Sequence, residues 1–195
     1  MPYRPTVTSR RCVNLRVDLR VVKKAPVSSV RYVTAAAYAE SVYIFDALTA
    51  SDIPSSMAAT QKYDTRTDTW ANTNQIPTVR TTKDDSTGAA VAETLMFKIY
   101  VIGGRNLDPN SPGIATNEAY NPVTDMWETK ASMPQDTGTD GTFAGAWGDS
   151  TIIVGGGAPG RSAVHRYNAA TDSWITGPPA ALSLCQLCAR VPTSK

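Results

Sequence analysis

The amino-acid sequence predicts an all-β protein that is built from repeated four-stranded units. Three observations support this prediction: an eight-residue pattern that occurs three times, an apolar run upstream of each copy, and a nearly regular distance between copies. The pattern is Tyr, then Asp or Asn, two variable residues, Thr-Asp, one variable residue and Trp. Its copies are YDTRTDTW (Tyr63 to Trp70), YNPVTDMW (Tyr120 to Trp127) and YNAATDSW (Tyr167 to Trp174). Self-similarity of this kind indicates a repeat architecture.

The apolar runs upstream are predicted to be strands. They are rich in β-branched and aromatic residues, and they end at turn signals. Since they are apolar at nearly every position, both of their faces should be covered, as happens when small sheets pack face to face in a β-propeller. The three runs are SVYIFDA at 41–47, KIYVIGG at 98–104 and TIIVGGG at 151–157.

Two of these runs end in a pair of glycines, which predicts a sharp bend with positive φ at the end of the strand. The pairs are Gly103 with Gly104 and Gly155 with Gly156, whereas Asp46 and Ala47 stand at this place in the first run.

Each eight-residue copy is expected to form a hairpin turn. Its second residue is a short polar side chain that can accept a hydrogen bond from the backbone two residues further on. Its threonine is expected to begin the return strand, its aspartate to be a turn carboxylate, and its tryptophan to pack against the neighbouring sheet with the indole N–H near a polar partner. These residues are, in that order, Asp64, Asn121 and Asn168; Thr67, Thr124 and Thr171; Asp68, Asp125 and Asp172; Trp70, Trp127 and Trp174.

The spacing between copies is 57 and then 47 residues from one tyrosine to the next, which brackets the roughly 50-residue period of kelch repeats. With its Gly-Gly pairs and its Tyr and Trp positions, the chain resembles the kelch-repeat β-propeller family. The resemblance implies three four-stranded blades at 31–78, 79–134 and 135–178. Residues 179–195 are expected to start a truncated fourth unit, so that the ring is incomplete or the chain a fragment.

Three blades leave two open blade faces, because propellers typically close with 4 to 8 blades. Self-association is therefore a possible way of covering them. The strands are expected at 33–39, 42–45, a third that ends at Tyr63 and a fourth from Trp70; then at 88–92, 97–102, 116–120 and 126–130; then at 142–147, 152–154, 163–167 and 173–176.

Residues 1–30 form a basic segment that needs its own explanation. The first 31 residues carry eight Lys or Arg against Asp18 alone, a balance of +7 within a total of +2, which leaves −5 for the rest. Apolar residues alternate with polar ones from Val13 to Val21, and this period of two favours an extra, half-exposed strand. A targeting segment and an arm that binds an anionic surface are the alternatives. Nucleic-acid binding is disfavoured because no aromatic residues are interleaved with the basic ones.

Composition places the chain among soluble proteins and does not predict a membrane partner. It has 195 residues, 42% of them hydrophobic, and no apolar run that approaches the length needed to cross a bilayer. Neither a secretory signal nor an Asn-x-Ser/Thr acceptor is visible, and these absences favour an intracellular location over a secreted one.

Apparent catalytic motifs fail on their context, and no cofactor, metal or catalytic residue is predicted. Gly155, Gly157 and Gly160 spell G-x-G-x-x-G, but a strand follows rather than the helix that nucleotide binding requires. The CxxC at Cys185 and Cys188 lacks two further ligands at suitable spacing. The kelch resemblance brings galactose oxidase to mind, whose copper site uses two histidines, but His165 is the only histidine of this chain.

Binding is instead expected in the loops that follow the second strand of each unit. A rigid ring that presents variable loops is a common arrangement for recognition. Arg105, Asn106 and Arg161 supply donors that suit acidic or carbonyl groups. The hypothesis is thus a protein–protein interaction module. The alternative is a kelch-like propeller enzyme that acts on a sugar, for which sialic-acid epimerases of this fold are a precedent.

Overall fold

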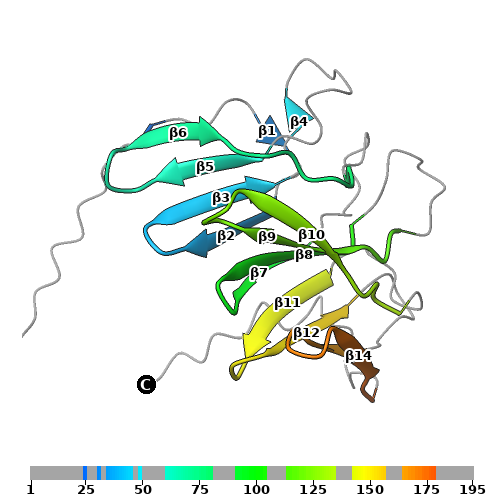
Figure 1. The fold of residues 1–195 in the computed structure, drawn as a ribbon. Coiled ribbons are helices and arrows are strands. Elements are labelled where there is room, and N and C mark those ends of the chain that lie inside the picture. Colours follow the sequence, from blue (N-terminus) through cyan, green and yellow to red (C-terminus); the bar gives the residue numbers. More distant parts are fainter. Residues whose placement is uncertain are drawn as a thin grey trace, which may run out of the picture.

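The computed structural model describes residues 24–25, 30–31, 34–45, 48–49, 60–80, 91–104, 113–134, 142–156 and 164–178. Every regular element within them is a β-strand (Figure 1). Because this part of the chain contains no helix, it also contains none long and apolar enough to cross a membrane.

Three four-stranded antiparallel sheets make up the structure, and each runs in chain order from its first strand to its fourth. We call them blades 1, 2 and 3. Blade 1 consists of β2 (Thr34–Tyr38), β3 (Ser41–Phe45), β5 (Gln61–Asp64) and β6 (Thr69–Asn72). Blade 2 consists of β7 (Val91–Leu95), β8 (Lys98–Ile102), β9 (Asn117–Asn121) and β10 (Met126–Lys130). Blade 3 consists of β11 (Thr142–Trp147), β12 (Thr151–Gly156), β13 (Val164–Asn168) and β14 (Ser173–Thr176).

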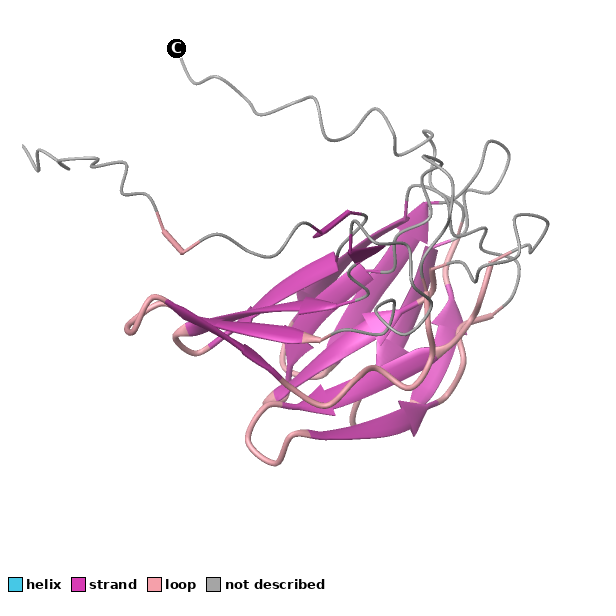
Figure 2. Cartoon of the chain, turned by 90° about the horizontal axis from the view of Figure 1, so that it is seen from above, coloured by secondary structure: helices cyan, strands magenta, loops and turns pink. Residues whose placement is uncertain are grey.

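The blades are arranged like the sectors of a fan. The first strands of successive blades, β2, β7 and β11, are neighbours, and the fourth strands β6, β10 and β14 lie on the outside (Figures 1 and 2). A small ribbon of β1 (Val30–Arg31) and β4 (Leu48–Thr49) prolongs the β2–β3 hairpin beyond the end of blade 1. This arrangement of four-stranded meanders is that of a kelch-type β-propeller, as the sequence predicts.

The core lies in two layers between the blades. Successive residues of a strand point to opposite faces of its sheet. Ile99 and Val101 of β8 accordingly pack against Tyr43 and Phe45 of blade 1. The alternate residues of β8, Tyr100 and Ile102, pack against blade 3. The prediction that the apolar runs are covered on both faces is therefore confirmed for blade 2.

Most predicted strands are found within one or two residues of their expected place, and β10, β11 and β14 have the predicted bounds. The first strand of blade 2 is the exception, because it was expected at 88–92 and lies at Val91–Leu95. Met96 and Phe97 form the turn to β8, and both have positive φ, 49° and 62°. Hairpin turns of this kind usually carry Asn or Gly, so Met-Phe gives no turn signal in the sequence.

Candidate functional site

The three repeated motifs form the same joint in each blade, which we call the clamp. It consists of the Tyr, the second Asp and the Trp of the eight-residue pattern. In blade 2, Asp125 Oδ1 accepts hydrogen bonds from the Tyr120 hydroxyl (2.7 Å) and from the backbone N–H of Asn74 (2.9 Å). The indole N–H of Trp127 donates to the carbonyl oxygen of that same Asn74 (3.0 Å). One residue of the connection from blade 1 is thus held at both its N–H and its C=O.

The other two clamps repeat this geometry. In blade 3, Asp172 and Trp174 hold Ala131, each at 2.8 Å, and the Tyr167 hydroxyl donates to Asp172 at 2.7 Å. In blade 1, Asp68 and Trp70 hold Ala25 at 3.0 and 3.1 Å, and the Tyr63 hydroxyl donates to Asp68. Asn74 and Ala131 each lie four residues after the Trp of the preceding blade. In blades 2 and 3 the clamp therefore fastens one blade to the next.

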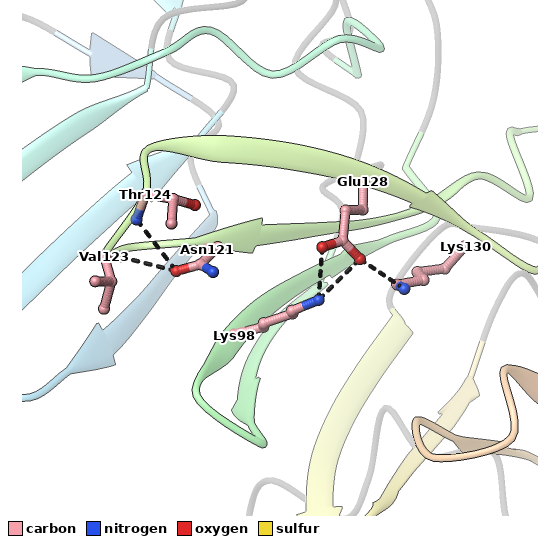
Figure 3. Close-up of polar contacts among 6 residues, drawn as sticks. All are labelled: Lys98, Asn121, Val123, Thr124, Glu128 and Lys130. Atoms are coloured by element: carbon pink, nitrogen blue, oxygen red, sulfur yellow. Dashed lines mark hydrogen bonds and ion pairs between the residues drawn. The ribbon is translucent and has the colours of Figure 1, made fainter.

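Local turn chemistry positions the clamp aspartates. The second residue of each pattern accepts N–H groups two and three residues further on: Asn121 Oδ1 accepts those of Val123 (2.9 Å) and Thr124 (3.3 Å), as Figure 3 shows. Asp64 and Asn168 do the same. The predicted turn is confirmed, but it is longer than expected. The threonines 67, 124 and 171 lie within it, and the return strand begins two residues later.

The clamp aspartates adopt the left-handed conformation, with φ of 56°, 56° and 49° at Asp68, Asp125 and Asp172. Asp and Asn tolerate this region better than other non-glycine residues. The repeated aspartate thus combines a backbone role with an acceptor role.

Electrostatics show that the clamp carboxylates are committed to the fold. The hydrogen bond to Asp68, followed by burial, raises the pKa of Tyr63 to about 12. Burial, followed by the bond to the neighbouring aspartate, raises the pKa of Tyr120 and of Tyr167. Burial opposes ionisation of Asp172, yet the N–H of Ala131 and the Tyr167 hydroxyl outweigh it and lower its pKa. An ionised acceptor that is already occupied by two donors is poorly suited to act as a general acid or base.

Tryptophan packing also follows the prediction. The Trp127 ring lies edge-on to Phe45 of blade 1, with ring centroids 5.6 Å apart. Trp174 packs against the layer between blades 2 and 3. Both indoles therefore lie at the joint between blades.

A charged cluster lies on the side of blade 2 that faces blade 3. Glu128 of β10 accepts from Lys98 Nζ of β8, at 2.7 and 2.8 Å to its two oxygens, and forms an ion pair with Lys130 at 2.7 Å (Figure 3). Hydrogen bonds from Lys130 and Lys98 lower the pKa of Glu128 to about 2. The pairs are partly exposed, so their contribution to stability is small.

Sequence reasoning missed a buried ion pair. Arg80 Nη2 lies 2.7 Å from Glu118 Oε2, and both side chains are almost fully buried. The Thr78 hydroxyl donates to the other Glu118 oxygen (2.8 Å), and Arg80 also donates to the carbonyl of Val101 (3.3 Å). The pair joins the connection after blade 1 to the second and third strands of blade 2. No local signal marks Arg80, because its partner lies 38 residues away in the sequence.

His165 occupies in blade 3 the place that Glu118 occupies in blade 2, two residues before the clamp tyrosine. It is fully buried in β13, as a third strand predicts. Its Nδ1 lies 3.1 Å from the Thr176 hydroxyl, and its ring lies edge-on to Trp174. Within the described ranges no group of three or more His, Cys, Asp or Glu residues is placed to hold a metal ion.

The two glycine pairs differ in conformation. Gly103 and Gly104 have φ of 71° and 100°, so the predicted bend at the end of β8 is confirmed. Gly103 N–H donates to the Thr116 carbonyl and Ile114 N–H donates to the Gly104 carbonyl, both at 2.9 Å, which closes the base of the loop between β8 and β9. Gly155 and Gly156 instead remain within β12, so no bend occurs there.

Gly155 has a steric role that explains this difference. A Cβ at this position would lie 2.7 Å from the Phe143 ring of the paired strand β11. The glycine is thus required by the close approach of an aromatic ring, and not by positive φ. The predicted binding residues Arg105, Asn106 and Arg161 lie outside the described residues, as do Asp46 and Ala47.

Comparison with known proteins agrees with this geometry. The family model of the Kelch motif matches residues 98–134, which include β8, its glycine bend, β9 and the clamp residues of blade 2. The chain contains kelch repeats. The repeat of blade 2 lends its geometry to blades 1 and 3, whose clamps have the same bonds.

Two similar proteins place the kelch repeats in context. An F-box/kelch-repeat protein of Arabidopsis thaliana is 53% identical over 38 residues, which is 20% of this chain and 10% of that protein. The solved structure of YjhT has a TM-score of 0.60 at 16% identity, over 81% of this chain and 52% of the other. The second likeness shows the fold. The chain thus spans about half the length of YjhT and a much smaller share of the Arabidopsis protein.

Proposed function

We propose that this kelch-repeat chain is a recognition module that binds a partner protein at the edge where the second strand of each blade ends. The observation that carries the proposal is the position of β3, β8 and β12. They are equivalent strands of successive blades, so the connections that follow them, to β5, β9 and β13, leave from the same edge. Loops on a rigid scaffold are the usual place for recognition.

The scaffold beneath this edge is well suited to hold loops in fixed positions. Three clamps fix the outer side of the blades, and two apolar layers fix the inside. At blade 2, the bonds at Gly103 and Gly104 fix where the chain leaves the sheet and where it returns. Arg105 follows this pair directly, and Arg161 follows β12, so we assign both to the contact with the partner, together with Asn106.

Guanidinium groups suit carboxylates, which makes an acidic segment the partner chemistry that we propose. The test compares proteins that are retained by the purified parent with those retained by the double variant Arg105→Ala/Arg161→Ala. Arg66→Ala is the matched control, because Arg66 is an exposed arginine in the β5–β6 turn at the opposite edge. We expect the double variant to lose partners and the control to keep them.

An unchanged set of partners in the double variant would contradict the site. Turnover of a sugar by the parent chain would favour the enzyme alternative instead. We also propose that the chain associates with itself, since described apolar residues of blade 3 are exposed on the face that points away from blade 2.

A further inference from the structure

The outward face of blade 3 exposes large apolar side chains. Ile152, Val154 and Trp174 pack against blade 2, so their strand neighbours point to the other face. Trp147 and Ile175 lie on this other face and are 63% and 57% exposed. Ile153 lies between them on β12 and is half-buried. We call this surface the back face of blade 3.

The same surface is covered in the blade before it. Strand register makes Trp147 the equivalent of Leu95 and Ile153 the equivalent of Tyr100. Leu95 and Tyr100 are buried in the layer between blades 2 and 3. The back face of blade 3 therefore exposes positions that blade 2 uses to bind the next blade.

The front face of blade 1, which points away from blade 2, is its counterpart. Ala35 and Ala37 of β2 are exposed there, and Val42 of β3 is half-buried. The equivalents of Ala35 and Val42 in blade 2 are Ala92 and Ile99. Ile99 is fully buried against blade 1, and Ala92 packs beside it. Each end of the fan thus presents one half of an interface that the structure forms twice internally.

We propose that the back face of blade 3 docks onto the front face of blade 1 of a second copy, and that the reciprocal contact closes a ring of six blades. This inference rests on the proposed self-association. Propellers typically have 4 to 8 blades. One copy provides three and three copies would provide nine, so two copies are the head-to-tail ring that falls within this range. The chain also matches 52% of a YjhT chain of the same fold, which is the share expected of half a propeller.

The clamp of blade 1 provides a detail of this ring. By analogy with Asn74 and Ala131, its ligand from the preceding blade would be Pro178 of the second copy, four residues after Trp174. Proline has no N–H to donate to Asp68. Ala25 of the same chain supplies both the N–H and the C=O that Asp68 and Trp70 bind. The ring contact therefore depends on the blade faces, and the clamp at its rim is filled from within the chain.

The experiment measures mass in solution by light scattering across a dilution series. We expect the parent to have twice the chain mass of 20.8 kDa. The back-face variant Trp147→Asp/Ile175→Asp and the front-face variant Ala35→Arg/Ala37→Arg are each expected at the chain mass. The control Phe97→Asp/Val123→Asp changes two exposed apolar residues in turns of blade 2 and is expected to remain a dimer.

Mixing the two face variants restores one native interface per pair, so a partial return to twice the chain mass is expected. It also shows that both variants are folded. A monomeric parent would refute both self-association and this ring. A dimeric parent whose mass neither face variant changes would leave self-association standing and refute the assigned faces. Assemblies that grow beyond two copies would refute closure. Loss of partner proteins by the Arg105/Arg161 variant is scored separately and does not depend on the mass.

Discussion

Replacement of Asp125 by alanine is the most direct test of the clamp. Asp125 accepts one hydrogen bond from Tyr120 and one from the backbone of Asn74. Hydrogen bonds to charged groups contribute about 1.5 to 3 kcal/mol each, and partial exposure reduces this to about 1 kcal/mol each. Alanine at a φ of 56° adds about 1 kcal/mol of backbone strain. We therefore expect Asp125→Ala to lower the free energy of unfolding by about 3 kcal/mol.

Two matched variants separate the contributions. Asp125→Asn keeps the tolerated backbone conformation and one acceptor oxygen, so we expect a loss of about 1 kcal/mol. Thr124→Ala changes an exposed turn residue and should lie within about 0.5 kcal/mol of the parent.

The assay is urea unfolding followed by tryptophan fluorescence, supported by thermal melts. A loss of 3 kcal/mol corresponds to a fall in Tm of about 6 to 12 °C for a chain of this size. If Asp125→Ala unfolds with the same free energy as Thr124→Ala, the clamp does not fasten the blades and our reasoning is wrong.

Three further predictions concern the same joints. Trp127→Ala should cost about 3 kcal/mol in urea unfolding, and Trp127→Phe about 1 kcal/mol because only the N–H is lost; equal losses would contradict the indole bond. Gly104→Ala should cost about 2 kcal/mol because its φ is 100°, whereas Gly145→Ala, which has open space, should cost nothing; indistinguishable melts would refute the bend. The lowered pKa of Asp172 gives stability that is present above pH 3.8 and lost as the pH falls through the folded value. The raised pKa of Tyr63 gives stability that is present below pH 10 and lost as the pH rises through about 12, so acid and alkaline titrations of stability should both show a decline at these limits.

Local chemistry explains why the turns could be predicted and one hairpin could not. Asp64, Asn121 and Asn168 make their bonds within three residues, so the sequence contains all that the turn needs. The β7–β8 turn has positive φ at Met96 and Phe97, which neither residue favours by itself. Packing of Leu95 and Ile99 into opposite layers fixes that register instead.

The glycine pairs show the same division between local and distant causes. Gly103 and Gly104 bend the chain as isolated glycines can. Gly155 stays in its strand because the Phe143 ring of the paired strand occupies the space of a side chain. An identical dipeptide thus has two roles, and only the neighbour in space distinguishes them.

The sequence by itself determined the all-β class, the repeat and the kelch identity, because these depend on spacing along the chain and on turn chemistry within a few residues. The tertiary structure decided which partner each repeated residue meets. Asp125 and Trp127 hold Asn74, 51 and 53 residues away, and Arg80 pairs with Glu118 across two strands. Such contacts form only when the blades stack, since burial makes an unpaired polar group costly and so selects the one arrangement in which each finds a partner.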